Sequence, residues 1–159
     1  SSYEGLEILQ NVARMTLTGI PLLNTKDRAH GEARGLAKFQ YGEMSDFLIK
    51  SEISGRMPYK LRCGDFAAMS PVVGGFGLTL NGAIAYASQG GPIVVAEDFK
   101  LIGDLFAVGV KSYKGNWNIG DQVVIKQNDE VTAVGIAKMV PEEMISMNRG
   151  VAVEVRHHV

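Results

Sequence analysis

Residues 120–156 read GDQVVIKQNDEVTAVGIAKMVPEEMISMNRGVAVEVR, and their first half predicts a β-hairpin. Val123–Ile125 is a β-branched run that follows a Gly-Asp turn, a pattern typical of a strand. Polar residues 127–130 predict the reversal of the chain, because Asn and Asp tolerate turn conformations. A return strand is therefore expected at Val131–Ala137.

The second half of the stretch predicts a short helix and a closing strand. Pro141 and the two glutamates after it favour a helix start, since proline fits the first turn and carboxylates stabilise its positive end. The pair at 149–150, Arg-Gly, ends that helix. Val151–Val155 then predicts the last strand.

Upstream, Gly90-Gly91-Pro92 is the clearest candidate for a domain boundary, because two flexible residues precede one with a locked φ. After it we expect a strand at Ile93–Ala96 and a short helix from Glu97 to Leu105. Phe106 to Tyr113 is then expected to resume as a strand. The chain is accordingly divided into modules at 1–91 and 92–159.

The first module predicts an α+β arrangement. Apolar residues within 3–18 recur at helical spacing. Residues 24–35 are polar and glycine-punctuated, which indicates a loop, and the pattern of Leu36 to Tyr41 fits either a helix end or a strand. A further short helix is expected at Ala83–Ala87. The expected strands are Phe47–Ile49, Met57–Leu61, Ala67–Pro71 and Gly77–Leu80. The first two of these are expected to be joined across Ser54-Gly55.

Composition describes an ordinary globular chain of 159 residues with 46% hydrophobic residues. No apolar run approaches the length of a membrane span. The single cysteine, Cys63, cannot form a disulfide within the chain, so a cytoplasmic location is expected. For Cys63, the role of a small, buried apolar side chain is favoured over the role of a nucleophile.

The formal net charge is −1, whereas nucleic-acid binding usually shows as a basic surplus. Residues 1–91 hold nine Lys and Arg against eight Asp and Glu, and residues 92–159 hold seven against nine. Affinity for RNA would therefore depend on local clusters and shape. One cluster comprises Lys50, Arg56, Lys60 and Arg62; a solvated strand face is an equally good interpretation of it.

Four motifs resemble the hallmarks of the PUA domain, an RNA-binding barrel of pseudouridine synthases and archaeosine transglycosylases. In chain order they are Phe106–Val110, Gly120-Asp121 before the valine strand, Ala133–Ala137, and Glu143-Met144 with Arg149–Val153. The resemblance covers residues 92–159. It implies a small mixed β-barrel, or pseudo-barrel, behind the α+β module.

The first module resembles a second region of known proteins. Ala37–Gly42, Phe47-Leu48 and Ser54–Met57 are similar to a segment of archaeal tRNA-guanine transglycosylases that lies just before their PUA domain. That segment belongs to the non-catalytic C-terminal part of those enzymes. With both modules included, the resemblance spans about residues 36–159.

The resemblance also implies an RNA-binding surface between the first helix of the domain, the strand after it and the closing strand. Carried over residue by residue, one wall comprises Gly103, Phe106, Val108, Gly109 and Lys111. The other comprises Arg149, Gly150 and Arg156, and Arg56 of the first module is added from its basic cluster. Asp104 places a negative charge near this surface, and at Val108 the transglycosylases usually carry a lysine.

No catalytic residue, metal site or cofactor is predicted. The transglycosylase barrel would need roughly 250 further residues, and one cysteine with three histidines gives no recognised zinc spacing. Trp117 with Tyr113 could stack on an unpaired base, although packing at a barrel rim is favoured. Three methionines, at 139, 144 and 147, are expected to face the core.

The leading hypothesis is a non-catalytic protein that binds tRNA, at the acceptor stem and 3′ end as the resemblance implies, in connection with archaeosine-type base exchange. A separate catalytic transglycosylase subunit would then be its partner. The alternative is a protein-interaction or assembly module with weak or lost RNA binding.

Overall fold

The computed structural model describes residues 35–42, 53–56, 60–70 and 75–159. By its backbone contacts the chain divides into two compact units, Ser1–Gly77 and Leu78–Val159. The boundary expected at residues 90–92 lies inside the second unit and stays a prediction. The expected helix at 3–18, the strand at Phe47–Ile49 and nearly all of the expected loop at 24–35 lie outside the described residues.

The described strands of the first unit form a sheet in the order β1-β2-β3-β4. Ser54 and Gly55, expected in a connection, lie instead within a strand, because they pair with Arg62 and Leu61 of the next strand. Burial of the Cys63 side chain agrees with the favoured interpretation of this residue. The strand bounds are β1 (Ile53–Arg56), β2 (Lys60–Cys63), β3 (Ala67–Ser70) and β4 (Gly75–Leu78).

The segment whose period was undecided is helical at residues 35–41. Ala37 and Tyr41, one turn apart, are both buried. The Gln40 side chain holds the backbone of Phe76 at both polar groups: its Nε2 donates to the carbonyl oxygen at 2.9 Å, and its Oε1 accepts from the N–H at 2.9 Å. The Gln40 amide thus makes the two hydrogen bonds to Phe76 that the backbone of a neighbouring strand would otherwise make.

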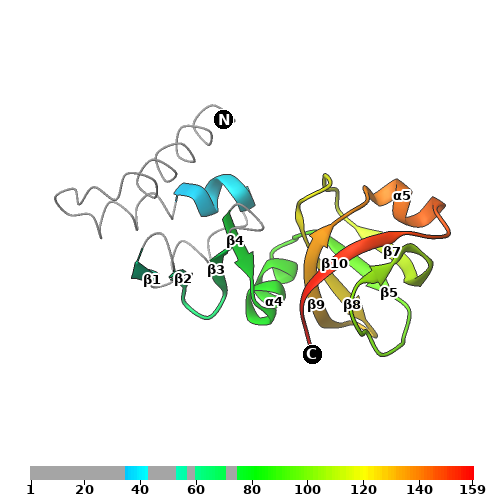
Figure 1. Cartoon of the computed structure of the whole chain (residues 1–159), viewed down its shortest axis with the longest axis horizontal. Helices are drawn as coiled ribbons and strands as arrows, with labels where there is room; N and C mark the ends of the chain where they lie inside the picture. Colours follow the sequence, from blue (N-terminus) through cyan, green and yellow to red (C-terminus); the bar gives the residue numbers. More distant parts are fainter. Residues whose placement is uncertain (1–34, 43–52, 57–59, 71–74) are drawn as a thin grey trace. The chain divides into compact units, whose positions relative to one another are not determined.

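The second unit is built on a six-stranded sheet in the order β6-β10-β9-β8-β5-β7 (Figure 1). Its two edge strands follow one another in the chain and are joined only by the 3₁₀ turn η2, so the sheet has to curl until its edges approach. The predicted small mixed β-barrel is thereby confirmed. The bounds are β5 (Ile93–Ala96), β6 (Leu105–Phe106), η2 (Ala107–Gly109), β7 (Val110–Lys114), β8 (Gln122–Gln127), β9 (Glu130–Ala137), α5 (Pro141–Ser146) and β10 (Val151–His158).

One more helix belongs to this unit. Helix α4 (Leu80–Ser88) begins at Thr79, whose hydroxyl accepts from the Gly82 N–H at 3.1 Å, and it lies beside β8 and β9. Burial raises the pKa of the Tyr86 phenol on this helix to about 12, with a smaller contribution from Asp121. The helix confirms the prediction at Ala83–Ala87.

The barrel interior is filled by buried side chains from β5, β6, β8, β9 and β10 and from the connections, and the partly buried Val110 of β7 packs against them. Trp117 is 4% exposed, and its indole Nε1 donates to the Met139 carbonyl oxygen at 2.9 Å. Its ring meets Tyr113 edge-on, with centroids 5.7 Å apart. Packing, the favoured role of Trp117, is therefore observed, but in the core of the barrel and not at its rim. The cluster comprises Val94, Ala96, Leu101, Leu105, Ala107, Trp117, Val123, Ile125, Ala133, Ala137, Met139, Met144, Ala152 and Val153.

The hairpin of β8 and β9 turns at Asn128 and Asp129, whose φ values are 50° and 63°. Two successive left-handed residues match the twist of the flanking strands. The predicted reversal at residues 127–130 is confirmed. The closing strand runs further than expected, to His158.

The helix expected from Glu97 to Leu105 is wrong. This segment is an irregular connection that leads into β6. The buried side chain of Gln127 donates through Nε2 to the carbonyl oxygens of Glu97 and Phe99, each at 2.8 Å, and these are carbonyls that a helix would have used. Thr132 completes the arrangement by donating to Gln127 Oε1 at 2.8 Å. The strand expected from Phe106 to Tyr113 is likewise interrupted, by η2.

Replacing Gln127 with methionine, which has a similar volume, is expected to destabilise the barrel by about 1–3 kcal/mol, because two carbonyl groups lose their donor. Urea unfolding followed by the fluorescence of Trp117 measures this change, and since the chain has one tryptophan the signal reports the second unit. Gln89→Met is the control, because Gln89 is an exposed residue at the end of α4. Equal midpoints for the two variants would contradict the role of Gln127.

Candidate nucleic-acid interface

The two walls expected from the sequence meet where β6 pairs with the start of β10. Phe106 lies opposite Val151 in this antiparallel pair. One residue further on, the Ala107 N–H donates to the Gly150 carbonyl oxygen at 2.9 Å. The turn that carries Arg149 therefore lies directly beside β6 and η2.

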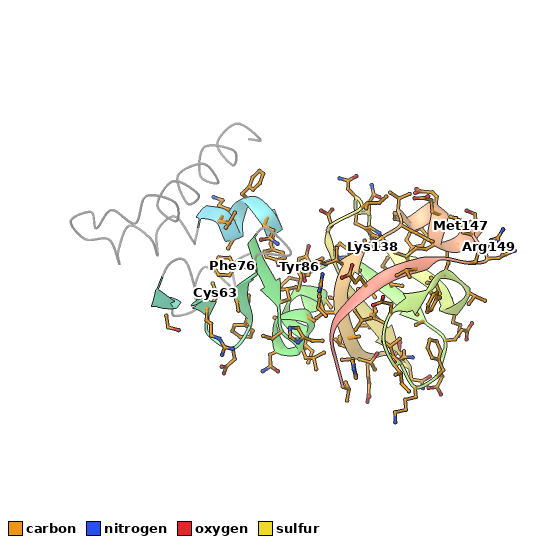
Figure 2. The ribbon with its side chains drawn as sticks, in the orientation of Figure 1. Cys63, Phe76, Tyr86, Lys138, Met147 and Arg149 are labelled. Carbon is orange, nitrogen blue, oxygen red and sulfur yellow. The ribbon has the colours of Figure 1, made fainter. Side chains whose placement is uncertain are left out.

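Large apolar side chains are exposed around this junction. Phe106 is 53% exposed and Val108 is 75% exposed. Helix α5 lies beside η2 and β7, and it adds Ile145, while Met147 follows the helix and is exposed instead of facing the core as expected. We refer to Phe106, Val108, Ile145 and Met147 as the apolar patch. Arg149, exposed at its side, supplies a positive charge (Figure 2).

The contribution of α5 to this surface was not predicted from the sequence motifs. Ile145 and Met147 were outside the motifs, and their exposure depends on which face of a short helix turns to the barrel. Met144, directly before Ile145, is 1% exposed and fills the core. Pro141 and Met144, three positions apart, are both buried, and this helical spacing in the sequence is the signal that could have placed Ile145 on the exposed face.

All three candidate glycines have a structural reason for lacking a side chain. At Gly150, φ is +97° and a Cβ would come 2.8 Å from the Met139 methyl carbon. At Gly109, a Cβ would meet the side chains of Phe99 at 3.1 Å and Leu105 at 3.2 Å. Gly103 has a φ of +76°, which favours glycine, but it is exposed and a Cβ there would meet open space. Close approach of a ligand to the main chain is thus unobstructed at Gly103.

Lys111 is exposed on the edge strand β7. Val95 pairs with Ser112 and Ala96 with Val110, so Lys111 is the extra residue of a β-bulge. Lys111 lies two residues after η2 in the chain, on the same segment as Val108.

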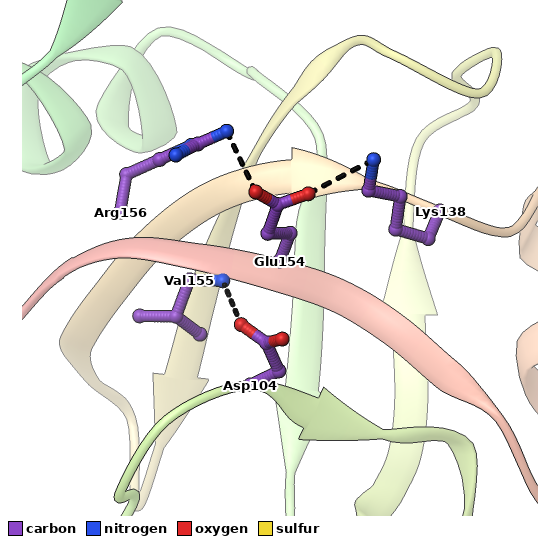
Figure 3. Close-up of polar contacts among 5 residues, drawn as sticks. All are labelled: Asp104, Lys138, Glu154, Val155 and Arg156. Carbon is purple, nitrogen blue, oxygen red and sulfur yellow. Dashed lines mark hydrogen bonds and ion pairs between the residues drawn. The ribbon is translucent and has the colours of Figure 1, made fainter. Parts of the chain in front are cut away.

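Arg156 lies away from this junction, near the other end of β10. At about 3.3 Å per residue, roughly 20 Å of chain separates it from Arg149. Its guanidinium contacts Glu154 Oε1 at 2.7 Å, and the other oxygen of the same carboxylate contacts Lys138 Nζ at 2.9 Å (Figure 3). The two arginines therefore belong to separate parts of the surface.

The cations lower the pKa of the Glu154 carboxyl below its usual value. The hydrogen bond from Lys138 is the largest cause, and the charges of Arg156 and Lys138 act in the same direction. Glu154 accordingly stays ionised at neutral pH.

Asp104, which the sequence placed near the RNA surface, has a structural partner. Its Oδ1 accepts from the Val155 N–H at 3.0 Å (Figure 3). Strand β6 pairs with β10 only at Val151 and Val153, so this carboxylate extends the pairing by one position. The Asp104 carboxylate is thus hydrogen-bonded to the backbone of β10, beside the register shift between Val155 and His157.

The last candidate, Arg56, belongs to β1 of the first unit and pairs there with Lys60. Its part in RNA binding stays a prediction. In the part of the chain that the structure describes, no three residues of the types His, Cys, Asp and Glu come together as a metal site. Nor does any described helix have the length and apolar character to cross a membrane.

Comparison with known proteins finds a family match to most of the second unit. The family model of the PUA domain matches residues 95–159. A crystal structure of a hypothetical protein from Pyrococcus horikoshii, 21% identical, covers 86% of this chain and 92% of its own with a TM-score of 0.60. This likeness concerns the fold alone.

Two curated relatives extend the similarity over the whole chain. An archaeosine synthase from Haloferax volcanii is 30% identical over 95% of this chain, and an archaeosine synthase subunit alpha from Methanosarcina acetivorans is 30% identical over 99% of it. The chain spans only 27% of the length of either relative. The names of these relatives agree with the archaeosine resemblance of the sequence, and they specify a synthase.

Proposed function

We propose, on the premise that residues 95–159 match the PUA domain, that the chain is the tRNA-binding part of an archaeosine-forming protein. The observation that carries the proposal is the junction of β6 and β10, where Phe106 and Val108 are exposed next to Arg149. An exposed aromatic ring can stack on an unpaired base, and an arginine beside it can hold a phosphate.

The single-stranded 3′ end of tRNA and its adjoining acceptor stem are the part of the molecule that this surface suits best. Unpaired bases are accessible for stacking, whereas bases inside an RNA helix are not. Gly103, with open space around it, allows the sugar-phosphate backbone to approach the main chain. Phe106, Val108 and Arg149 form the centre of the site, with Lys111 at its edge.

Catalysis is proposed to occur on another domain or subunit. The relatives named archaeosine synthase are more than three times as long as the region that this chain matches. One of them is named a subunit, which supports the existence of a partner chain. The present residues would hold the tRNA while the modification takes place elsewhere, in the cytoplasm.

The salt dependence of tRNA binding tests this proposal. With phosphate contacts from Lys111, Arg149 and Arg156, the logarithm of the binding constant should fall with the logarithm of the salt concentration with a slope between about −2 and −3. The double variant Arg149→Ala, Arg156→Ala should bind more weakly, with a slope near about −1. Absence of tRNA binding by the wild type at low salt would exclude the function.

A protein-interaction module is the second candidate function. The favouring observation is the exposure of Val108 and Ile102, at 75% and 76%, on a unit whose acidic residues outnumber its basic ones. In that case alanine at Val108 should weaken capture of a catalytic partner and leave tRNA binding unchanged. Recovery of a transglycosylase-like or synthase-like protein in a pull-down, without tRNA affinity, would favour this candidate.

A further inference from the structure

The Glu154 carboxylate bridges two cations that come from different segments of the barrel. Lys138 follows β9, and Arg156 is two residues beyond Glu154 on β10. The contacts are 2.9 Å to Lys138 Nζ and 2.7 Å to the Arg156 guanidinium (Figure 3). Each cation therefore meets a separate oxygen of one anion.

This arrangement is the one that a phosphate group would form with the same cations. Carboxylates and phosphates both present two acceptor oxygens, and arginine binds both in the same forked geometry. All three side chains remain open to solvent: Lys138 is 45% exposed, Arg156 32% and Glu154 31%. With one negative and two positive groups, the cluster has a formal charge of +1.

We infer that Lys138 and Arg156 form a second phosphate-binding site, which Glu154 occupies in the absence of RNA. The inference rests on the proposed tRNA binding and adds a residue, Lys138, that no sequence motif indicated. A phosphate of the RNA backbone displaces the Glu154 side chain and takes its place between the two cations. Because roughly 20 Å of chain separates Arg156 from Arg149, the site holds a different part of the RNA from the apolar patch.

Two features of the backbone keep the cations in place when Glu154 moves. Asp104 holds the Val155 N–H at 3.0 Å, next to Arg156. The Lys138 N–H donates to the Ala152 carbonyl oxygen at 2.8 Å, which fixes the start of the Lys138 side chain against β10. Glu154 can therefore swing away without loss of the site.

Replacement of Glu154 by glutamine is the test. Glutamine keeps the shape of the side chain and removes the charge that competes with phosphate. We expect tRNA to bind at least about threefold more tightly at low salt, with a steeper salt dependence, since a phosphate no longer has to displace a carboxylate from the two cations. The melting temperature of the variant should stay within a few degrees of the wild type, because exposed ion pairs contribute little to stability.

Glu130→Gln is the matched control. It makes the same change of net charge at an exposed residue, at the opposite end of β9 from Lys138. An equal gain in the two variants would mean that the effect is one of overall charge, and it would overturn the inference. A loss of affinity in Glu154→Gln would do the same, since Glu154 would then be orienting Arg156 for RNA.

The combined variant Glu154→Gln, Lys138→Ala, Arg156→Ala completes the experiment. It should lose the gain, and a gain that persists would also overturn the phosphate site. The proposed function and the inference fail in different ways. If wild type binds tRNA and Glu154→Gln binds it equally, only the inference is wrong; if no variant binds tRNA at low salt, both are wrong.

Discussion

Alanine in place of Gly135 is expected to destabilise the barrel by about 3 kcal/mol or more, which is the largest effect of any single substitution proposed for this chain. Gly135 lies in the middle of β9 and pairs with Val123 on one side and Val155 on the other. A Cβ there would collide with the carbonyl group of Glu154 and come 2.9 Å from a methyl carbon of Val153.

The collision at Gly135 cannot be relieved by a rotamer change, because the carbonyl of Glu154 belongs to the backbone of β10. Accommodation would require β10 to move away from β9, and the cluster of Lys138, Glu154 and Arg156 would open with it. Trp117 fluorescence during urea unfolding measures the effect on this unit alone. A loss of less than about 1 kcal/mol would show that the two strands have room to separate.

The double variant Phe106→Ala, Arg149→Ala is expected to lower tRNA affinity by about ten- to a hundredfold. Stacking of one base on an aromatic ring contributes about 1–3 kcal/mol, and removal of the arginine adds the loss of a phosphate contact. Both side chains are exposed, so the barrel should fold normally. Binding is measured by titration at fixed salt, first with intact tRNA and then with tRNA that lacks its unpaired 3′ nucleotides.

Loss of the 3′ nucleotides should weaken the wild type and leave the double variant almost unchanged, because the same contact has already been removed. The matched control is Ile84→Ala with Lys114→Ala. Ile84 on α4 is as exposed as Phe106, at 53%, and Lys114 ends β7 far along the strand from η2. If the control pair weakens binding as much as the test pair, the apolar patch is not the RNA site.

The strands of the barrel could be predicted because local chemistry determines them. The β-branched run at Val123–Ile125, the Asn-Asp turn and the proline that opens α5 each favour their observed structure without help from distant residues. The helix expected from Glu97 to Leu105 failed for the opposite reason. Its backbone is held by Gln127, roughly thirty positions away in the chain, and no local pattern indicates such a partner.

The candidate site was predictable only in part, for a similar reason. The motif residues Phe106, Arg149 and Gly150 do come together, because β6 pairs with β10. Arg156, the other candidate cation on this side, lies in a separate cluster, because about seven residues of largely extended chain separate it from Arg149. Lys138 belongs to none of the motifs, and its position beside Glu154 depends on the register between β9 and β10.

The bulge at Lys111 has a consequence for self-association. Strand β7 is an edge of the sheet, and its outer backbone groups could pair with an edge strand of another molecule. A bulge breaks the regular spacing that such pairing needs, and charged lysines at 111 and 114 would have to lose water on contact. Lys111 thus protects the barrel against aggregation through this edge, whether or not it also contacts RNA.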